Sequence, residues 1–466
     1  MRHDILLRII KIISVLLSVC AFGGCWYGYY SGVITSPFYA KGNYVVIALY
    51  AIILLVFTRV YDALQISYTG KGQIVYSQFL ALGFSDAIIY IVICLLSKGF
   101  PSLIPGLICF VIQFFLSILW ALFAQKMYFT LFKPSKTLII YDQRNGLEHT
   151  IERYELESKY DIVKVIDINE CLADLSALNG IEVVFLSGIH SHERNIILKK
   201  CIADDIRVFV IPRVGDVIMS GAHKMHMMHL PMLRVERYRP AIEFQFVKRM
   251  MDIIISFVAI IILSPALLIS AILIKAYDKG PVFYKQNRLT KDGKIFKIIK
   301  LRTMRVDAEK DGVARLSSGD KDDRITPVGR FLRKVRADEI PQLFNILGGS
   351  MSLIGPRPER PEIAEQYEKE MPEFRLRLQA KAGLTGYAQV YGKYNTTPYD
   401  KLQMDLMYIA NPSLLEEASI MFATIKILFM PESTEGVDPG QVTALDYENV
   451  ANCTEKWEKQ KERWVD

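Results

Sequence analysis

The run Ile253–Ile274, IIISFVAIIILSPALLISAILI, carries no charged side chain, and the pair Ser264-Pro265 stands near its middle. A helix of this length can cross the hydrocarbon core of a bilayer, but proline removes a backbone N–H donor and kinks a helix. The basic residues that flank the run are Lys248, Arg249, Lys275, Lys279, Lys285 and Arg288. Since basic flanks favour the cytoplasmic side, we expect a re-entrant helix over 248–275, with Ser264 helping to satisfy the broken backbone. A kinked helix that spans the bilayer is the alternative.

Four further apolar runs precede this one, at about 12–34, 43–58, 77–97 and 99–125. Each is near the length of a transmembrane helix, so we predict a four-helix transmembrane bundle over 1–130. Basic residues before the first run, between the second and third, and after the fourth predict that both ends of the bundle are cytoplasmic. No signal-peptide cleavage site follows the first run, so we expect it to be retained as an anchor. Asp86 interrupts the third run and is assigned no role.

The composition agrees with a membrane protein. Of the 466 residues, 51% are hydrophobic, which is high for an ordinary soluble enzyme. The formal charge of +7 suits phosphate-rich substrates or anionic lipid headgroups. The seven cysteines form no C-x-x-C pair and no grouping with histidine at metal-ligand spacing. They are interpreted as packing residues in a reducing compartment.

Between 134 and 240, short β-like runs alternate with polar, helix-length segments. The runs are 137–141, 162–166, 181–186 and 206–211, and Ser191–Ala203 is one of the helical segments. This alternation predicts a small Rossmann-like α/β domain with a parallel sheet. The turn at 141–146, Tyr-Asp-Gln-Arg-Asn-Gly, lacks the G-x-G-x-x-G motif that brings a backbone close to pyrophosphate. We therefore expect a regulatory or oligomerising role and no dinucleotide cofactor.

The segment 276–430 is the most charged part of the chain. Alternating residues around the turn Lys291-Asp292-Gly293-Lys294 predict a β-hairpin with a basic face. The loop Asp307–Asp323 is typical of a solvated surface. Its pair Asp322-Asp323 would also suit a metal-nucleotide site, an interpretation that we rank below solvation.

In the stretch Arg333–Asn345, two adjacent carboxylates, Asp338 and Glu339, follow three cations and precede an apolar run. One interpretation makes Asp338 the N-cap of a helix with Pro341 in its first turn. The other interpretation makes the pair a reactive centre. A helix N-terminus at this point would also attract phosphate. Further along, prolines on both sides of Arg357 restrict its backbone, which favours a phosphate or nucleotide contact over a surface role.

Motifs in 245–430 resemble those of the bacterial sugar transferases, the monotopic polyprenyl-phosphate phosphoglycosyl transferases. In order, they are Lys248-Arg249-x-x-Asp252, the Ser264-Pro265 break, Lys300-Leu301-Arg302-Thr303-Met304, Asp338-Glu339-Ile340-Pro341-Gln342-Leu343-Phe344-Asn345, Gly355-Pro356-Arg357-Pro358 and Gly383-Leu384-Thr385-Gly386. The amino-terminal half is similar in architecture to the large members that start capsule, exopolysaccharide or O-antigen synthesis. Ala382 and the segment Asn411–Glu417 depart from the family pattern, which leaves the donor sugar open.

The resemblance implies transfer of a sugar-1-phosphate from a UDP-sugar to undecaprenyl phosphate with release of UMP. Glucose and galactose are the sugars that it favours. Asp338 matches the family's nucleophile, which forms a covalent phosphosugar intermediate, and Glu339 matches the residue associated with Mg²⁺. The other candidates are Arg333, Arg357, Lys300 and Arg302 for phosphate or nucleotide binding, and Lys248 and Arg249 as basic residues at the membrane interface.

We therefore predict a mixed membrane protein, with the transmembrane bundle over 1–130, the α/β domain over 134–240, an α+β catalytic domain over 245–430 on the re-entrant helix, and a polar tail over 431–466. The expected location is the bacterial inner membrane, with the catalytic domain on the cytoplasmic face. The expected partners are the UDP-sugar, undecaprenyl phosphate, the bilayer and a second copy in a homodimer, and no nucleic acid. The alternative function is a non-enzymatic membrane scaffold or regulator of polysaccharide assembly.

Overall fold

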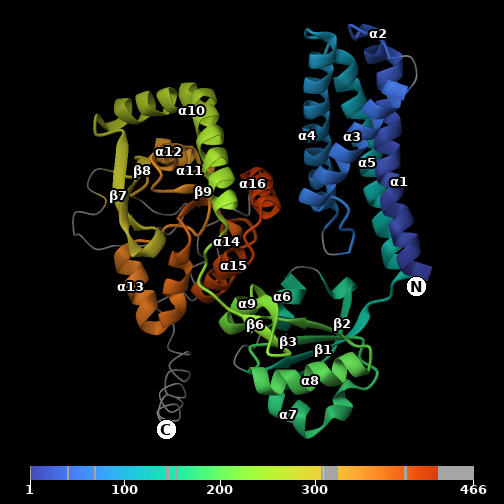
Figure 1. Cartoon of the computed structure of the whole chain (residues 1–466), viewed down its shortest axis with the longest axis vertical. Helices are drawn as coiled ribbons and strands as arrows, with labels where there is room; N and C mark the ends of the chain where they lie inside the picture. The colour runs from blue at the N-terminus through green and yellow to red at the C-terminus, as the bar shows by residue number, and fades with distance from the viewer. Residues whose placement is uncertain are drawn as a thin grey trace. The chain divides into compact units, whose positions relative to one another are not determined.

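The computed structural model describes residues 2–38, 41–67, 70–142, 147–153, 156–305, 308, 324–392 and 396–428. The chain divides into two compact units, Met1–Pro212 and Arg213–Asp466, which are described separately (Figure 1). Three segments singled out in the sequence lie wholly or partly outside the described residues: the loop Asp307–Asp323 with its pair Asp322-Asp323, the polar tail 431–466, and the end of the turn 141–146.

The amino-terminal apolar runs are helical. The helices are α1 (Arg2–Cys25), which continues through a π-helical turn (Trp26–Tyr30) into α2 (Ser31–Val33), α3 (Lys41–Val60), α4 (Lys71–Ser97) and α5 (Ile104–Leu131). Within the described part of the chain, five helical segments are long and apolar enough to cross a membrane: these four and one in the second unit. The protein is a membrane protein by this measure.

Polar contacts between the amino-terminal helices fix their alignment. The indole of Trp26 donates to the side-chain oxygen of Asn43 at 3.0 Å, and the indole of Trp120 donates to the Ile10 carbonyl at 2.8 Å. The amide of Gln113 donates to the Tyr50 hydroxyl at 2.8 Å. Because a polar group without a partner is costly inside hydrocarbon, each of these contacts ties one helix to a particular neighbour.

A four-stranded parallel sheet with the order β2-β1-β3-β4 follows the helices and confirms the predicted α/β region. Its strands are β1 (Ser135–Tyr141), β2 (Tyr160–Asp167), β3 (Val183–Ser187) and β4 (Arg207–Val210), and its helices are α6 (Leu147–Arg153), α7 (Ile168–Ala173) and α8 (Ser191–Ala203), with 3-10 turns at Leu156–Ser158 and Leu175–Leu178. The central strand β1 is buried on both faces. Leu138 and Ile140 pack into one apolar cluster and Ile139 into another, as a strand covered on both sides requires.

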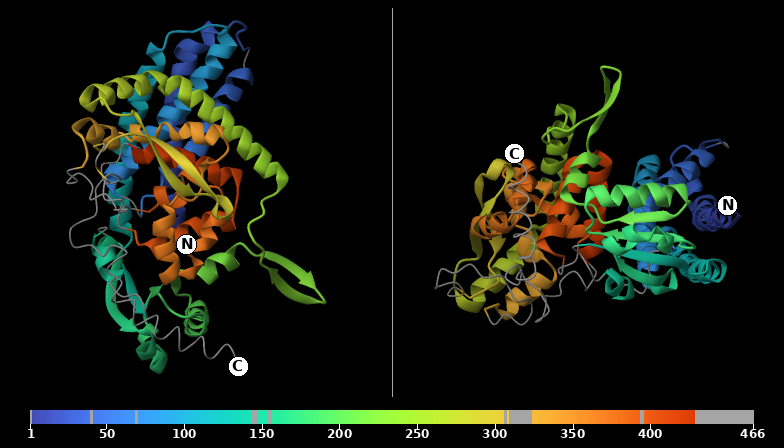
Figure 2. Two further views of the ribbon diagram at one scale, coloured as in Figure 1. Left: turned by 90° about the vertical axis from the view of Figure 1, so that its left-hand side faces the viewer. Right: turned by 90° about the horizontal axis from the view of Figure 1, so that it is seen from below.

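The two compact units meet at Pro212–Arg213, whereas we expected the α/β domain to run to residue 240. The helix α9 (Val214–Ser220) belongs to the second unit because Val214 and Val217 pack in one apolar cluster with residues of α15 (Pro398–Ala410). The hairpin of β5 (His223–Met227) and β6 (Leu230–Arg234) follows it. In Figure 2 this hairpin extends away from the rest of its unit.

The long helix α10 (Ile242–Asp278) contains the apolar run and is bent, as Figure 1 shows. Pro265 lies inside it and has no N–H to donate to the carbonyl of Ile261, four residues earlier. The hydroxyl of Ser264 donates to that same carbonyl at 2.8 Å. The side chain therefore supplies the hydrogen bond that the proline removes.

The rest of the second unit is α+β. β7 (Phe283–Leu289) and β8 (Ile295–Leu301) form an antiparallel hairpin through the turn Lys291–Gly293, which confirms the predicted hairpin, and β9 (Ser352–Ile354) pairs in parallel with β10 (Gly383–Thr385). The helical elements are α11 (Pro327–Lys334), the 3-10 turn Ala337–Glu339, α12 (Gln342–Leu347), α13 (Pro361–Glu370), the 3-10 helix Pro372–Gln379, α14 (Tyr387–Val390), α15 and α16 (Leu414–Leu428).

Three glycines bring two backbone segments into direct contact at the ends of β9 and β10. A Cβ atom on Gly355 would lie 2.2 Å from the carbonyl oxygen of Lys381. On Gly383 or Gly386 it would lie 2.1 Å from backbone atoms of Gly355. This close approach requires glycine at all three positions and determines where the segment after Gly355 begins.

Candidate active site

The two adjacent carboxylates lie in a tight turn between α11 and α12. Arg336 ends the preceding helix in the left-handed conformation, with φ 52°, and the 3-10 turn Ala337–Glu339 follows. α12 begins only at Gln342, and no side chain caps it. The interpretation of Asp338 as a helix N-cap is therefore wrong, because the helix starts too far along the chain.

Glu339 is held by two cations. Its Oε1 accepts a hydrogen bond from Lys300 Nζ at 3.2 Å and from Arg357 Nη2 at 3.0 Å, and the side chain is 14% exposed. Burial works to raise the pKa of Glu339, but the charges of Lys300 and Arg357 outweigh it and hold the pKa well below the ordinary value. Glu339 is thus a carboxylate at any physiological pH.

Asp338 differs from its neighbour. Its carboxylate makes no hydrogen bond or ion pair with any residue in the described part of the chain. Burial, followed by the charge of Glu339, raises the pKa of Asp338 to about 6, while Lys300 and Arg333 oppose this shift. Two neighbouring carboxyl groups with pKa values moved in opposite directions are typical of an acid pair with divided roles.

Three of the four predicted phosphate-binding cations converge on this pair. Lys300 reaches Glu339 from β8 and Arg357 reaches it from the loop after β9. The charge of Arg333 acts on Asp338, and its Nε donates to the Thr303 hydroxyl at 2.9 Å. The cations come from three separate segments, so the fold is what assembles the cluster.

Arg302 lies apart from the other three. Its side chain is buried, and its guanidinium packs over Gly280, where a Cβ atom would come within 2.4 Å of it. The structure shows no contact between Arg302 and either carboxylate among the described residues.

The basic residues at the start of α10 have their partners within the protein. Lys248 pairs with Glu417 and donates to the Ile354 carbonyl at 3.0 Å. Arg249 donates to the carbonyls of Ile346 and Leu347, at 2.7 and 2.8 Å, at the end of α12. Both head groups therefore join α10 to the elements around the site instead of standing free at the apolar surface.

Asn345 supports the site from α12, although no role is predicted for it from the sequence. Its Oδ1 accepts from the Ile299 N–H and its Nδ2 donates to the Lys297 carbonyl, both at 2.9 Å. The side chain thus bonds like an extra strand residue to the edge of β8 and fixes α12 beside Lys300. The available signal was a polar residue inside the apolar run that follows Asp338-Glu339.

The donor atoms of the site bear on whether it can hold Mg²⁺. Among the described residues, no three histidine, cysteine, aspartate or glutamate side chains gather into a metal-binding group. Mg²⁺ bound to phosphate substrates takes one or two carboxylates, and water and phosphate complete its shell. Asp338 and Glu339 supply such carboxylate oxygens, although Oε1 of Glu339 already accepts from two cations. The pair fits the ion only in company with a phosphate-bearing substrate.

Comparison with known proteins points to one family. Residues 243–431 match the family model described as bacterial sugar transferase. Over 234 residues the chain is 37% identical to the UDP-N-acetylgalactosamine-undecaprenyl-phosphate N-acetylgalactosaminephosphotransferase of Aeromonas hydrophila, covering 50% of this chain and 54% of that protein.

Two shorter relatives are covered more fully. The chain is 46% identical over 132 residues to the putative undecaprenyl-phosphate N-acetylgalactosaminyl 1-phosphate transferase of Bacillus subtilis, covering 28% of this chain and 73% of the relative. It is 36% identical over 199 residues to the UDP-glucose:undecaprenyl-phosphate glucose-1-phosphate transferase of Caulobacter vibrioides, covering 42% of this chain and 74% of that relative. The chain thus spans about half the length of the Aeromonas protein and about three quarters of the other two.

Proposed function

The chain belongs to the bacterial sugar transferase family, and we propose that it transfers a sugar-1-phosphate from a UDP-sugar to undecaprenyl phosphate, releasing UMP. Relatives named for this kind of reaction support the proposal. The observation that carries it is the contrast within one turn: Asp338 has no partner among the described residues, while Glu339 is held by Lys300 and Arg357.

The first step uses Asp338 as the nucleophile. A carboxylate oxygen of Asp338 bonds to the β-phosphorus of the UDP-sugar, and the bond from that phosphorus to the bridging oxygen breaks. UMP leaves with the bridging oxygen. The sugar phosphate is then bound to the enzyme as an acyl phosphate, which divides one difficult transfer into two easier ones.

The second step returns the enzyme to its starting state. A phosphate oxygen of undecaprenyl phosphate bonds to the same phosphorus, and the bond to Asp338 breaks. The product is undecaprenyl diphosphate sugar, and the aspartate is again a carboxylate. Both attacking oxygens are ionised at neutral pH, so neither step requires a general base.

The cations stabilise the charge on the phosphoryl group. Arg357 and Arg333 are the residues that we assign to the phosphoryl oxygens, and Lys300 keeps Glu339 and Arg357 together. We assign Mg²⁺ binding to Glu339, and an ion held there with the diphosphate would neutralise part of the charge of the diphosphate. Donors already directed at the site cost no reorganisation during the reaction.

We place the active site at the cytoplasmic face of the inner membrane. The bend of α10 at Ser264-Pro265 supports a re-entrant helix, and only 11% of its apolar window is buried within the protein. A helix that enters and leaves on one face would hold the site at headgroup depth, within reach of a soluble donor and a lipid acceptor. In a Lys285→Cys variant, an impermeant maleimide should label the new thiol from the cytoplasmic side only. Labelling from outside would instead support a helix that spans the bilayer.

The function is tested by UMP release from membranes supplied with undecaprenyl phosphate, Mg²⁺ and a panel of UDP-sugars. We expect release with at least one of UDP-glucose, UDP-galactose and UDP-N-acetylgalactosamine. We expect glucose or galactose as the transferred sugar. UDP-N-acetylgalactosamine must also be in the panel, because two of the relatives are named for N-acetylgalactosamine. The alternative, a non-enzymatic scaffold or regulator, predicts no Mg²⁺-dependent UMP release with any donor.

We also propose that the protein acts as a homodimer. Light scattering on the protein in detergent should then give twice the mass of the 466-residue chain. A monomer mass at concentrations that support full activity would contradict this part of the proposal.

A further inference from the structure

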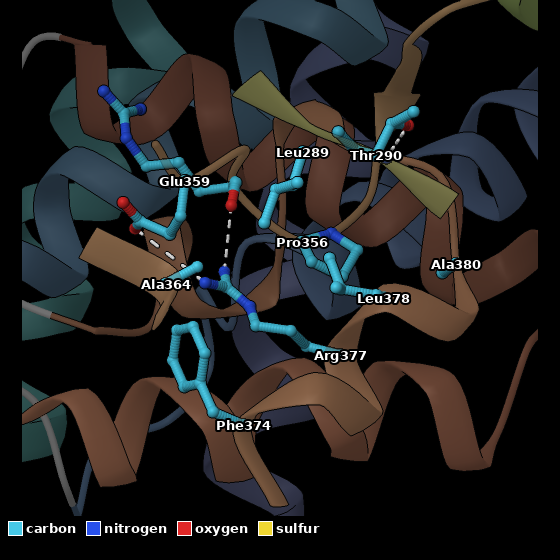
Figure 3. Close-up of a pocket in the computed structure, with 11 residues that line it drawn as sticks. Leu289, Thr290, Pro356, Glu359, Ala364, Phe374, Arg377, Leu378 and Ala380 are labelled. Carbon is cyan, nitrogen blue, oxygen red and sulfur yellow. Dashed lines mark hydrogen bonds and ion pairs between the residues drawn. The ribbon is translucent and has the colours of Figure 1, made fainter. Parts of the chain in front are cut away.

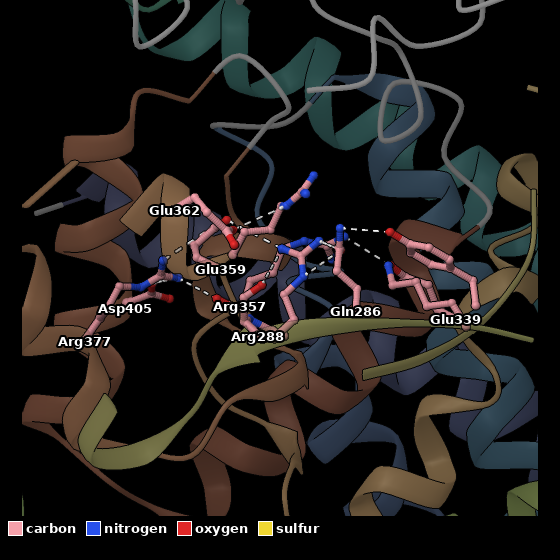
Figure 4. A network of polar contacts seen from close by, with 12 residues as sticks. Gln286, Arg288, Glu339, Arg357, Glu359, Glu362, Arg377 and Asp405 are labelled. Carbon is pink, nitrogen blue, oxygen red and sulfur yellow. Dashed lines mark hydrogen bonds and ion pairs between the residues drawn. The ribbon is translucent and has the colours of Figure 1, made fainter. Parts of the chain in front are cut away.

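Arg357, which contacts Glu339, belongs to a short segment whose backbone is held from several sides. Arg377, on the 3-10 helix Pro372–Gln379, donates from Nη2 to the carbonyl oxygen of Arg357 at 2.9 Å. The same nitrogen lies 2.6 Å from Oδ2 of Asp405, which comes from α15. The side chains of Arg377 and Asp405 are only 5% and 2% exposed, so this ion pair is inside the protein. Figure 4 shows the two side chains next to each other.

A second arginine holds the next carbonyl along. Arg288 of β7 donates from Nη1 to the Pro358 carbonyl at 3.0 Å, and Gln286 fixes its other edge by accepting from Nε and Nη2 at 3.1 and 2.7 Å. Glu359 lies between the two guanidinium groups, 3.8 Å from each. Figure 3 shows Arg377 directed toward Glu359.

The flanking prolines explain this arrangement. Pro356 and Pro358 have no N–H, so the segment must be fixed mainly through its carbonyl oxygens. All four consecutive carbonyls accept a hydrogen bond, each from a different residue: Pro356 from Gly383 N–H, Arg357 from Arg377, Pro358 from Arg288, and Glu359 from Leu289 N–H. Of these four hydrogen bonds, the one from Arg377 holds Arg357, the residue whose side chain contacts Glu339.

The burial of the Arg377–Asp405 pair points to a geometric purpose. Removing two charges from water costs several kcal/mol per ion, and the pair's own attraction often only offsets this cost. Replacing the pair by apolar side chains is often neutral or stabilising. The pair is therefore poorly explained by stability alone, whereas its contact with the backbone of Arg357 gives it a function.

We propose that Arg377, oriented by Asp405, is a positioning residue that fixes Arg357 for its contacts with Glu339 and with the diphosphate of the substrate. This inference rests on the proposed function. Arg377 acts through Arg357 and does not itself reach the reacting atoms. A displacement of a positioned group by about 1 Å can lower a rate by about a hundredfold, which sets the expected size of the effect.

The test is a double-mutant cycle on kcat/KM for UMP release, with Arg377→Met, Arg357→Ala and the double variant. If Arg377 acts through Arg357, we expect Arg377→Met to lower kcat/KM by about 30- to 100-fold in the native background. In the Arg357→Ala background it should lower kcat/KM by less than about threefold. The matched control is Arg375→Met on the same 3-10 helix, where the side chain is 74% exposed, and this change should leave kcat/KM unaltered.

Two effects that multiply in the double variant would overturn the inference, because a general loss of structure is felt whether or not Arg357 is present. Thermal melting of each variant accompanies the kinetics. If Arg377→Met does not fold, Arg377→Lys replaces it, since lysine keeps the charge beside Asp405 but loses the planar fork of donors. Failure of the proposed function would look different: no UMP release by the native protein, or no effect of Arg357→Ala alone.

Discussion

The parallel-sheet region of the first unit and the second unit both pack around apolar cores, but they place their charges differently. In the sheet region, Lys200 pairs with Asp204 with side chains 41% and 36% exposed. In the second unit, the Lys248–Glu417 pair is 15% and 4% exposed, and the Arg377–Asp405 pair is 5% and 2% exposed. The described ion pairs of the sheet region are all at least partly exposed, whereas the second unit buries some of its pairs and leaves others, such as Arg375–Glu368, near the surface.

This difference indicates where the chemistry lies. An exposed ion pair contributes about 0–1 kcal/mol to stability, so its position is weakly constrained. A buried pair is costly to desolvate, so its contribution to stability alone is a weak explanation for its presence. The Arg377–Asp405 pair, which contacts the backbone of Arg357, is of this kind, and it agrees with our proposal that the reaction takes place in the second unit.

The largest expected effect is that of Asp338→Asn on UMP release. The amide cannot form the covalent intermediate that we propose, so kcat should fall by on the order of 10⁴-fold. The matched change in the first unit is Asp205→Asn, at an exposed position with a left-handed backbone that asparagine tolerates. We expect Asp205→Asn to keep full activity. Near-native UMP release by Asp338→Asn would remove the nucleophile assignment.

Arg357→Ala should follow in size. Loss of one positioned donor to a phosphoryl group lowers kcat by about 10²- to 10³-fold. The corresponding loss of a cation in the first unit, Lys200→Ala, should leave kcat unchanged. Steady-state rates with saturating donor compare the two. Equal losses for both variants would mean that the charge of the whole protein matters, and not the position of Arg357.

The contrast between buried and exposed pairs can be tested on stability. Asp405→Asn leaves the buried charge of Arg377 without its carboxylate, and we expect this to destabilise the protein by about 3 kcal/mol. Asp204→Asn removes an exposed pair and should cost at most about 1 kcal/mol. Denaturant unfolding in detergent, followed separately for each unit, measures both. Similar costs at the two sites would contradict our distinction between the regions.

The smallest expected effect concerns pH. Because burial raises the pKa of Asp338 to about 6, kcat/KM should rise with pH up to about 6 and then level off as the nucleophile ionises.

The same raised pKa affects stability. The pKa of Asp338 in the folded state exceeds the value in the unfolded state, so the folded state holds the proton more tightly and loses stability as pH rises through 4–6. Asp338→Asn removes this loss and should stabilise the protein by about 1–2 kcal/mol at pH 7.5, after allowance for solvent. A melting curve that shows no gain at pH 7.5, or the same gain at pH 4, would exclude the raised pKa.

Local pattern was sufficient to predict much of this molecule. The apolar runs, the parallel strands from Ser135 to Val210 and the hairpin around Asp292 follow from periodicity and turn residues, and the structure contains all of them. The neighbouring carboxylates Asp338 and Glu339 were singled out because two adjacent acids are unusual between a basic and an apolar run. Arg357 was singled out because prolines stand on both sides of it.

Long-range pairing could not be predicted in the same way. Lys300 and Arg302 are basic residues of the same short motif, and the sequence does not distinguish their roles. Of the two, only Lys300 contacts Glu339, because β8 ends at Leu301 and Arg302 packs against Gly280. The partner of Lys248 lies 169 residues along the chain. No periodicity reports such a contact, and a basic flank beside an apolar run has the same appearance whether it meets lipid or protein.

The contact among Gly355, Gly383 and Gly386 has a consequence for mutational scanning. Alanine at any of the three would force apart two backbones that already touch and would displace the segment leading to Arg357. An alanine scan scored by activity would therefore group these glycines with the residues of the chemistry, although none of them has a side chain to contribute. A scan that also records folding for each variant would separate residues that react from residues whose only contribution is to occupy no space.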